Sequence, residues 1–312
     1  MTAEQPSHIS VIDPISLAIE RVKVMLFRPF DLGKWFTIGF CAWLAYLCGG
    51  GGGGGANWNS PYKSPEQKAK IAEGVGSAKA YLLGNLYWVV PAAVIVVVLI
   101  IAIGLVVIWL NSRGRFMFLH CVAANKSEVK VPWHKFRKHG NSLFLFRIVL
   151  SIIGLAIVAV PVLGITFLGI MMASKAVPYI AAIPGIILCS LIVIVLVIML
   201  SLVKKFTFDF VVPIMFLRAE SCMAGWREFM TILSVNKARL ALYILFQIVI
   251  AIAIGTIVFL GCCIGCCFCC ASALLFVPYI GSVILLPIFV FRQSYTIYYL
   301  RQFGPGFDVF GS

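Results

Sequence analysis

Six long apolar segments dominate the sequence and constrain its fold more than any other feature. Each approaches or exceeds the ~20 apolar residues that a helix needs to cross a bilayer. Apart from Lys34 and Arg147, which lie near the starts of two segments, none contains a charged residue. Because a charge at the bilayer centre is costly, such segments are typical of membrane-spanning helices. The predicted spans are Leu32–Cys48, Leu86–Leu110, Leu143–Met172, Pro178–Val203, Leu240–Gly261 and Ala271–Phe291.

The composition supports this prediction and excludes two other classes of protein. The chain is 62% hydrophobic and 12% charged, whereas soluble domains are roughly 45–50% apolar and about 25% charged. Intrinsically disordered chains are poor in apolar residues, so disorder is excluded as well. We therefore expect an all-α fold: one integral membrane domain over residues 1–312, a polytopic helical bundle with about six transmembrane helices and additional interfacial helices.

Basic residues divide unevenly between the two predicted sides of the membrane. Of the 25 Lys and Arg residues, 20 fall in the arm 1–30, the loops 111–141 and 204–239, the tail 292–312 and the adjoining span ends. The predicted outer loop 49–81 carries most of the others. The positive-inside rule then places both termini in the cytoplasm, and we expect a multi-pass protein of the bacterial inner membrane. The net charge of +14 reflects this bias and does not indicate a nucleic-acid partner.

Two shorter amphipathic helices are predicted beside the spans. The first follows Asp13 and Pro14, a favourable helix start, and ends at Pro29. The second covers Ala219–Ser234. Its predicted apolar face consists of Met223, Trp226, Met230 and Leu233. These helices either cover the inner rim of the bundle or bind a partner or lipid surface.

A run of seven glycines, Gly49–Gly55, follows the first predicted span. A phosphate-binding loop would need a preceding strand and a Gly-Lys-Ser/Thr continuation, and both are missing. We interpret the run as a linker or a fraying helix end. A close helix-packing or ligand contact is the alternative.

Six cysteines cluster between the fifth and sixth predicted spans, and they are the candidate metal ligands of the chain. They are Cys262, Cys263, Cys266, Cys267, Cys269 and Cys270. Two overlapping Cys-x-x-Cys pairs would suit zinc or an iron–sulfur cluster. However, the surroundings are apolar and no basic neighbour would lower a thiol pKa. Packing as small residues is therefore the favoured interpretation, with disulfides and metal binding as alternatives.

A second metal-like pattern is incomplete. Cys121, His134 and His139 have a finger-like spacing but lack the second cysteine. The intervening lysines and arginines indicate a basic loop that faces the membrane. No metal and no cofactor is predicted here.

Enzymatic activity is not expected. The sequence has no His-Glu-x-x-His motif, and its predicted spans contain no Asp or His. A membrane-embedded lipid enzyme would need a polar cluster at the cytoplasmic interface around Arg115, His120 and Asp209. The leading hypothesis is a non-enzymatic scaffold or accessory protein that acts through its basic cytoplasmic face.

The alternative is a passive transporter or channel for a small solute. Proline and glycine interrupt the second, fourth and sixth predicted spans, for example at Pro91, Pro184 and Pro278, and broken helices can line a substrate path. The expected partners are the lipid bilayer and either another membrane protein or a second copy of the chain.

Several short stretches carry a resemblance to a known family. The block from Arg28 to Trp35 (RPFDLGKW), the short span after it and the glycine run resemble an uncharacterised family of bacterial multi-pass membrane proteins. Further matching stretches are Ser112–Phe116, Trp133 with Gly140-Asn141-Ser142, and Phe303-Gly304-Pro305. The chain is also distantly similar to the membrane domain of some glycerophosphodiester phosphodiesterases, but it lacks their catalytic domain. The resemblance implies membrane topology and no specific chemistry.

Overall fold

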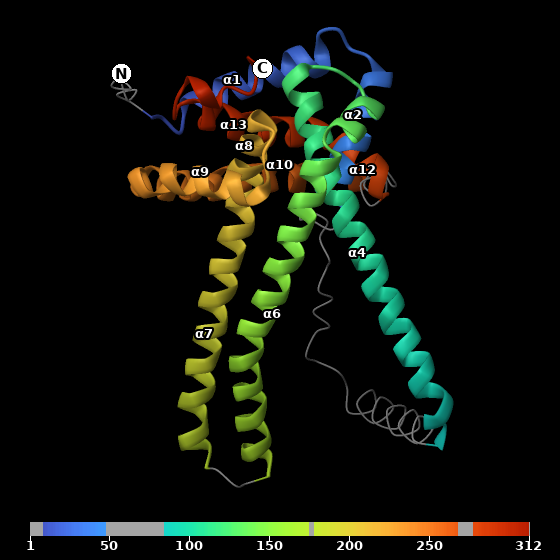
Figure 1. Ribbon diagram of the computed structural model, residues 1–312, viewed down its shortest axis with the longest axis vertical. Helices are drawn as coiled ribbons and strands as arrows, with labels where there is room; N and C mark the ends of the chain where they lie inside the picture. The colour runs from blue at the N-terminus through green and yellow to red at the C-terminus, as the bar shows by residue number, and fades with distance from the viewer. Residues whose placement is uncertain (1–8, 48–83, 175–177, 268–276, 312) are drawn as a thin grey trace.

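The structure, a computed structural model, is helical throughout the residues that it describes, 9–47, 84–174, 178–267 and 277–311. Shorter helices form a layer at one end, and α4 (Leu86–Ala124), α6 (Arg137–Ala173) and α7 (Tyr179–Phe206) extend away from it as long rods (Figure 1). α7 continues without a break into the π-helical turn η2 (Thr207–Val211) and then α8 (Val212–Arg218).

Four helical stretches of the described chain are long and apolar enough to cross a membrane. They are Tyr87–Ala124, Arg137–Ala173, Tyr179–Arg218 and Lys237–Cys263. The last belongs to α10 (Lys237–Cys267), which is foreshortened in Figure 1. These four helices coincide with the second to fifth predicted spans. The predicted count of six is not shown.

The first and last predicted spans have a different structure. α2 (Leu32–Tyr46) has only 15 residues, and its end lies just before a part of the chain outside the described residues. The last region contains α12 (Pro278–Ile284) and α13 (Leu286–Arg301), which are separated at Leu285. Each of these helices falls short of the ~20 residues needed to span a bilayer.

Packing explains why α2 differs from a lipid-facing span. Its residues Ile38, Cys41, Ala42 and Ala45 are completely buried, because α2 packs against α4 on one side and α12 on the other. An ideal Cβ on Gly114 of α4 would lie only 2.6 Å from the backbone carbon of Leu44. The apolar residues of α2 are therefore covered by protein.

Both predicted amphipathic helices are present, with altered boundaries. The first consists of α1 (Asp13–Val22) and the π-helical turn η1 (Lys23–Phe27), and α1 packs against α13. The second is α9 (Cys222–Val235), with Ser221 as its N-cap. The apolar face predicted for this second helix is wrong in part: Met223 and Met230 are 69% and 51% exposed. The buried residues of α9 are Cys222, Gly225 and Phe229, because η2 and α8 pack against the adjacent face of the helix.

We use two names for the regions of the molecule. The helical head consists of α1, η1, α2, residues 111–124 of α4, α5 (Lys130–Lys135), residues 137–147 of α6, η2, α8, α9, residues 237–250 of α10, α12, α13 and η3 (Pro305–Phe307). The membrane segments are residues 87–110, 148–173, 179–203 and 251–263.

Aromatic side chains dominate the core of the helical head. The ring of Phe210 in η2 lies 5.3 Å from that of Phe229 in α9 and 5.0 Å from that of Tyr243 in α10. Tyr243 in turn stacks on Tyr299 of α13 at 4.6 Å. All four side chains are completely or almost completely buried. This stack joins four helices into one body.

The membrane segments contact one another much less. In the most apolar 18-residue windows of α4 and α7, 0% of the residues are buried, and the corresponding shares for α6 and α10 are 6% and 11%. The main exception is the pair α6 and α7, where Gly154 allows Leu200 to approach within 3.0 Å of its ideal Cβ position. The membrane segments thus form no closed core of their own.

Candidate functional site

A polar site lies where the helical head meets the membrane segments. α4, α6 and α7 enter the head there, and α13 crosses the same end of the molecule (Figure 1). The π-helical turn η2 continues α7 at this level, and such turns occur frequently at functional sites. Its residue Asp209 contributes a carboxylate at the border of an apolar region.

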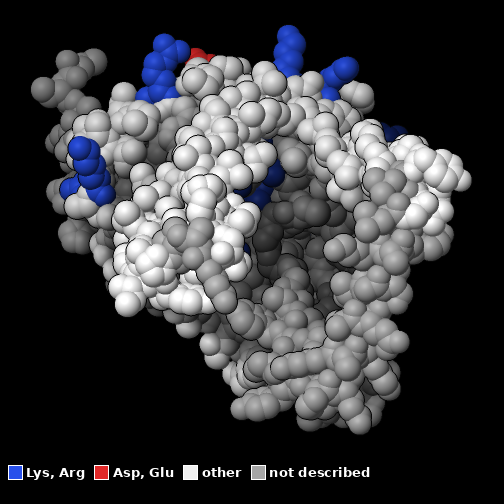
Figure 2. All heavy atoms as spheres, turned by 90° about the horizontal axis from the view of Figure 1, so that it is seen from below, with Lys and Arg blue, Asp and Glu red and all other residues white. Residues whose placement is uncertain are grey.

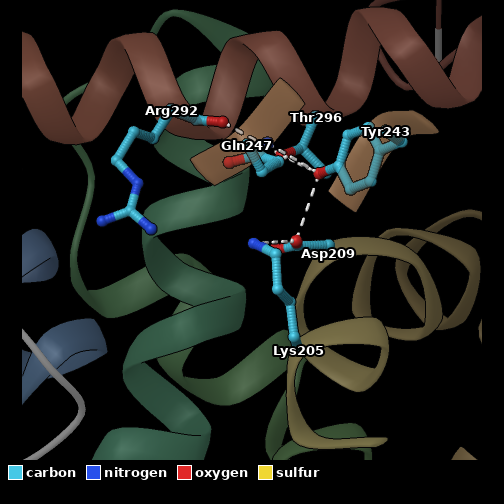
Figure 3. A network of polar contacts seen from close by, with 6 residues as sticks. All are labelled: Lys205, Asp209, Tyr243, Gln247, Arg292 and Thr296. Atoms are coloured by element: carbon cyan, nitrogen blue, oxygen red, sulfur yellow. Dashed lines mark hydrogen bonds and ion pairs between the residues drawn. The ribbon is translucent and has the colours of Figure 1, made fainter. Parts of the chain in front are cut away.

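Asp209 is held directly by two side chains, and a third supports one of them (Figure 3). Lys205 Nζ forms an ion pair with Asp209 Oδ2 at 2.9 Å, and the hydroxyl of Tyr243 donates to the same oxygen at 3.1 Å. Gln247 Nε2 donates to the Tyr243 hydroxyl at 2.9 Å. The position of the carboxylate is therefore fixed by α7 and α10 together.

The network continues to α13. The hydroxyl of Tyr243 lies 3.1 Å from Thr296 Oγ1, which donates to the backbone carbonyl of Arg292 at 3.1 Å. Figure 3 shows the guanidinium of Arg292 extending from α13 to the same side as Lys205 and Asp209. The side chain of Arg292 is exposed. A solvent-accessible cation thus lies beside the buried part of the network.

Tyr299 strengthens the same junction from α13. Its hydroxyl donates to the backbone carbonyl of Arg239 in α10 at 3.0 Å. Burial raises the pKa of Tyr299 to about 12, because the charged phenolate is poorly solvated there. The phenol therefore stays protonated and keeps this hydrogen bond at neutral pH.

Arg115 of α4 lies between two aromatic rings. Its guanidinium carbon is 4.5 Å from the centre of the Tyr46 ring and 4.1 Å from that of Phe208. Its Nε atom is buried and has no hydrogen-bond partner among the described residues. The guanidinium is close enough to Asp209 and Arg292 for their charges to act on it. Aromatic stacking therefore positions this cation through its faces.

Arg147 of α6 shares one of these rings. Its guanidinium carbon lies 5.1 Å from the centre of the Phe208 ring. Its Nη1 atom donates to Asn111 Oδ1 at 2.6 Å and to Ser112 Oγ at 3.1 Å. Two arginines from different helices therefore meet at one phenylalanine. We call Arg115, Arg147, Lys205 and Arg292 the basic cluster.

A further arginine of this region, Arg113, belongs to a separate structural contact. Arg113 stacks between Trp109 and Trp133, with its guanidinium carbon 4.2 Å and 4.9 Å from the ring centres. Its Nη2 atom and Trp109 Nε1 both donate to Asn141 Oδ1, each at 3.2 Å. This group ties α4, α5 and α6 together.

The structure brings together two of the three residues of the predicted interfacial cluster. Arg115 and Asp209 interact electrostatically. His120 instead lies against Phe136 and Phe216, with ring centres 5.8 Å and 6.3 Å apart. The predicted trio therefore does not form one catalytic group.

The cysteine and histidine patterns do not form a metal centre in the part of the chain that the structure describes. No three Cys, His, Asp or Glu side chains gather there where they could hold a metal ion. Cys121 instead lies 3.8 Å from Cys41, sulfur to sulfur. Of the cysteine cluster, Cys269 and Cys270 lie outside the described residues, and of the side chains only those of Cys262 and Cys263 are described. The glycine run 49–55 also lies outside the described residues.

Several residues of the site were not predicted as functional. In the sequence, Arg147 stands out only as a charge near the start of a span. Lys205 belongs to the basic loop 204–239, and Arg292 belongs to the tail 292–312. Tyr243 and Gln247 lie inside a predicted span, and polar side chains there are a recognisable signal for a buried network. The convergence of the four cations depends on helix packing, which the sequence alone does not reveal.

No curated protein and no solved structure matches the chain. A family model matches residues 9–271, which include most of the helical head and all the membrane segments. The predicted likeness to phosphodiesterase membrane domains receives no support from these comparisons. The chain belongs to the family of unknown function DUF7544.

Proposed function

We propose that this protein is a non-enzymatic scaffold or accessory protein of the bacterial inner membrane, which acts through the basic face of its helical head. The observation that carries the proposal is the contrast in packing between the head and the membrane segments. The head has a continuous hydrophobic core that includes buried aromatic rings, whereas the membrane segments leave most of their apolar side chains exposed. Such an architecture anchors a structured surface at the membrane.

The distribution of basic residues supports a cytoplasmic position for that surface. The loops around α5 and α9, predicted to be cytoplasmic, both lie in the helical head. Exposed cations of the first loop are Lys126, Lys130, Lys135, Arg137 and Lys138. By the positive-inside rule, a head that carries these residues faces the cytoplasm.

Helix continuity weighs against the transporter alternative. α4 and α7 run through Pro91 and Pro184 without a break, so the interruptions that motivated this alternative are absent from those two helices. Liposomes that contain the purified protein should not become permeable to small sugars, amino acids or inorganic ions. Flux of one of these solutes, at rates that depend on the amount of protein, would favour a transporter instead.

Photo-cross-linking in cells tests the accessory function. A photoreactive residue at Lys138, on the head, should give discrete cross-linked species, and one at Val97, in a membrane segment, should give fewer. One quadruple variant replaces the other exposed cations of the first loop by Gln: Lys126, Lys130, Lys135 and Arg137. This variant should lose the cross-linked species formed at position 138.

The matched control replaces the four lysines of the predicted outer loop by Gln: Lys63, Lys68, Lys70 and Lys79. This variant should preserve the cross-linked species. Equal loss in both quadruple variants would contradict a specific role of the head.

A further inference from the structure

Among the described residues, the basic cluster contains more positive charge than its neighbours balance. One carboxylate, that of Asp209, is paired with Lys205 and also acts on Arg115. Arg115 and Arg147 act on each other as like charges, and so do Arg115 and Arg292. Because like charges near an apolar region repel strongly, the site favours an additional anion.

The geometry of the arginines leaves donors for such an anion. Arg115 lies between the rings of Tyr46 and Phe208 and also hydrogen-bonds the Tyr46 side chain. Stacking of this kind leaves the other N–H groups at the edge of the guanidinium available. Its buried Nε has no hydrogen-bond partner in the described chain. Arg292 is exposed and extends to the same side. Guanidinium groups bind phosphate oxygens with paired hydrogen bonds.

The level of the cluster in the molecule indicates the kind of anion. Asn111 accepts from Arg147 and directly follows the apolar stretch 87–110 of α4. The pair Lys204 and Lys205 directly follows the apolar stretch 179–203 of α7. This boundary between charge-free and charged sequence is the expected level of lipid phosphates. Basic pockets between membrane helices at this level are known to bind anionic headgroups.

The described residues leave a hollow on this side. Viewed from the end to which the long helices extend, the molecule is hollowed, and basic side-chain atoms are seen within the hollow as well as around the rim (Figure 2). The side chains of Lys205 in the basic cluster and of its partner Asp209 are 28% and 21% exposed. A ligand that approaches from the membrane side can therefore reach the site.

We propose that the basic cluster binds a phosphate group, supplied by the headgroup of an anionic phospholipid or by free phosphate. Arg115 and Arg292 contact the phosphate oxygens, Arg147 adds positive charge beside Phe208, and Lys205 is held in place by Asp209. The proposal concerns a ligand site, so it does not depend on the accessory function proposed above.

The lipid source is tested with nanodiscs of phosphatidylcholine that contain graded amounts of phosphatidylglycerol. Native mass spectrometry should detect retained phosphatidylglycerol on the wild-type protein. Arg115→Gln and Arg292→Gln should each weaken its retention about tenfold or more, since each removes charge-assisted hydrogen bonds. Arg227→Gln, at an exposed arginine of α9 outside the cluster, is the matched control and should retain the lipid like the wild type.

The free-phosphate source is tested with inorganic phosphate alone, by calorimetric titration of the protein in phosphatidylcholine nanodiscs. Binding that Arg292→Gln weakens, without selective retention of phosphatidylglycerol, identifies free phosphate as the ligand. Phosphatidylglycerol that excludes inorganic phosphate from the site identifies the lipid. Either result supports a phosphate site.

Asp209→Asn should strengthen phosphate binding, whereas the arginine variants should weaken it. The amide oxygen can still accept from Tyr243, but the negative charge is lost, so phosphate or phosphatidylglycerol should bind several-fold more tightly. A merely structural role of the cluster would not produce this gain. Because Arg115 is partly buried and its variant could misfold, the decision rests on Arg292→Gln and Asp209→Asn, each checked by near-ultraviolet circular dichroism. The proposal is overturned if both folded variants bind both probes like the wild type.

Discussion

The helical head and the membrane segments both contain many large apolar side chains but are stabilised in different ways. In the head, these side chains cover one another: Phe210, Tyr243 and Tyr299 are at most 1% exposed. In the membrane segments, apolar side chains such as Phe167 and Ile100 remain 59% and 64% exposed. Hydrophobicity alone therefore does not distinguish a protein core from a lipid-facing surface.

The difference lies in what accompanies the apolar residues. The head interleaves them with aromatic rings, polar groups that find hydrogen-bond partners and small residues that allow close approach. The membrane segments consist largely of aliphatic residues with internally satisfied backbones, as lipid requires. The head should therefore be sensitive to changes in side-chain shape, whereas the membrane segments should tolerate them.

The largest effect is expected when an aromatic ring of the head core is removed. Phe210→Ala should lower the free energy of unfolding by about 3–5 kcal/mol, because it empties the space between Phe229 and Tyr243. Phe167→Ala, the same change in a membrane segment of α6, should cost less than about 1 kcal/mol, since most of that side chain is exposed. Denaturation by sodium dodecyl sulfate in mixed micelles measures both values. Equal losses would show that the membrane segments are packed as tightly as the head.

A smaller effect is expected from adding one methyl group to α4. Gly114→Ala brings a Cβ to within 2.7 Å of backbone and side-chain atoms of α2, and overpacking of this kind costs about 1–3 kcal/mol. Gly104→Ala, ten residues earlier on the same helix, has no atom within 4 Å of the added Cβ and should leave stability nearly unchanged. Thermal unfolding in detergent checks the pair. A stable Gly114→Ala variant would mean that α2 can move away from α4 at little cost.

The sequence predicts the fold class and the four long spans well, because a charge-free stretch of sufficient length has few alternatives. It does not reveal the surroundings of α2, where a similar local pattern is covered by protein. The decisive contact there is between Gly114 and Leu44, and one glycine within a helix does not reveal which element it faces. In the sixth predicted span, where prolines indicate an interruption, the chain is divided at Leu285 between α12 and α13, and Pro287 lies in the first turn of α13.

The candidate site was predictable only in part. Arg115 and Asp209 could be named as polar residues near the membrane boundary, yet their neighbours Arg147 and Arg292 come from helices whose arrangement depends on tertiary packing. His120 is predicted with them as a polar residue at the cytoplasmic interface, but it lies five residues after Arg115. On an α-helix, residues five apart lie on different faces, and His120 accordingly packs against Phe136 and Phe216.

The smallest effect is expected at the edge of the head, where one cation caps a long helix. Arg21 Nη2 donates to the carbonyl oxygens of Val122 and Ala123 at 2.7 Å and 2.8 Å, near the end of α4. These carbonyls have no partner within the helix, and a cation at this end also interacts favourably with the helix dipole. Arg21→Gln should therefore lower the free energy of unfolding by about 1.5 kcal/mol.

Because this contact is local, it tests whether the helical head and the membrane segments are stabilised separately. Lys23→Gln, at an exposed position two residues away, removes the same charge without removing a cap and should leave stability unchanged. Hydrogen exchange should then show faster exchange at the end of α4 near Ala123 in Arg21→Gln, with no change at residues 87–110. Faster exchange along the whole of α4 would instead indicate that its membrane segment depends on the head for its helical structure. That result would contradict separate stabilisation of the two regions.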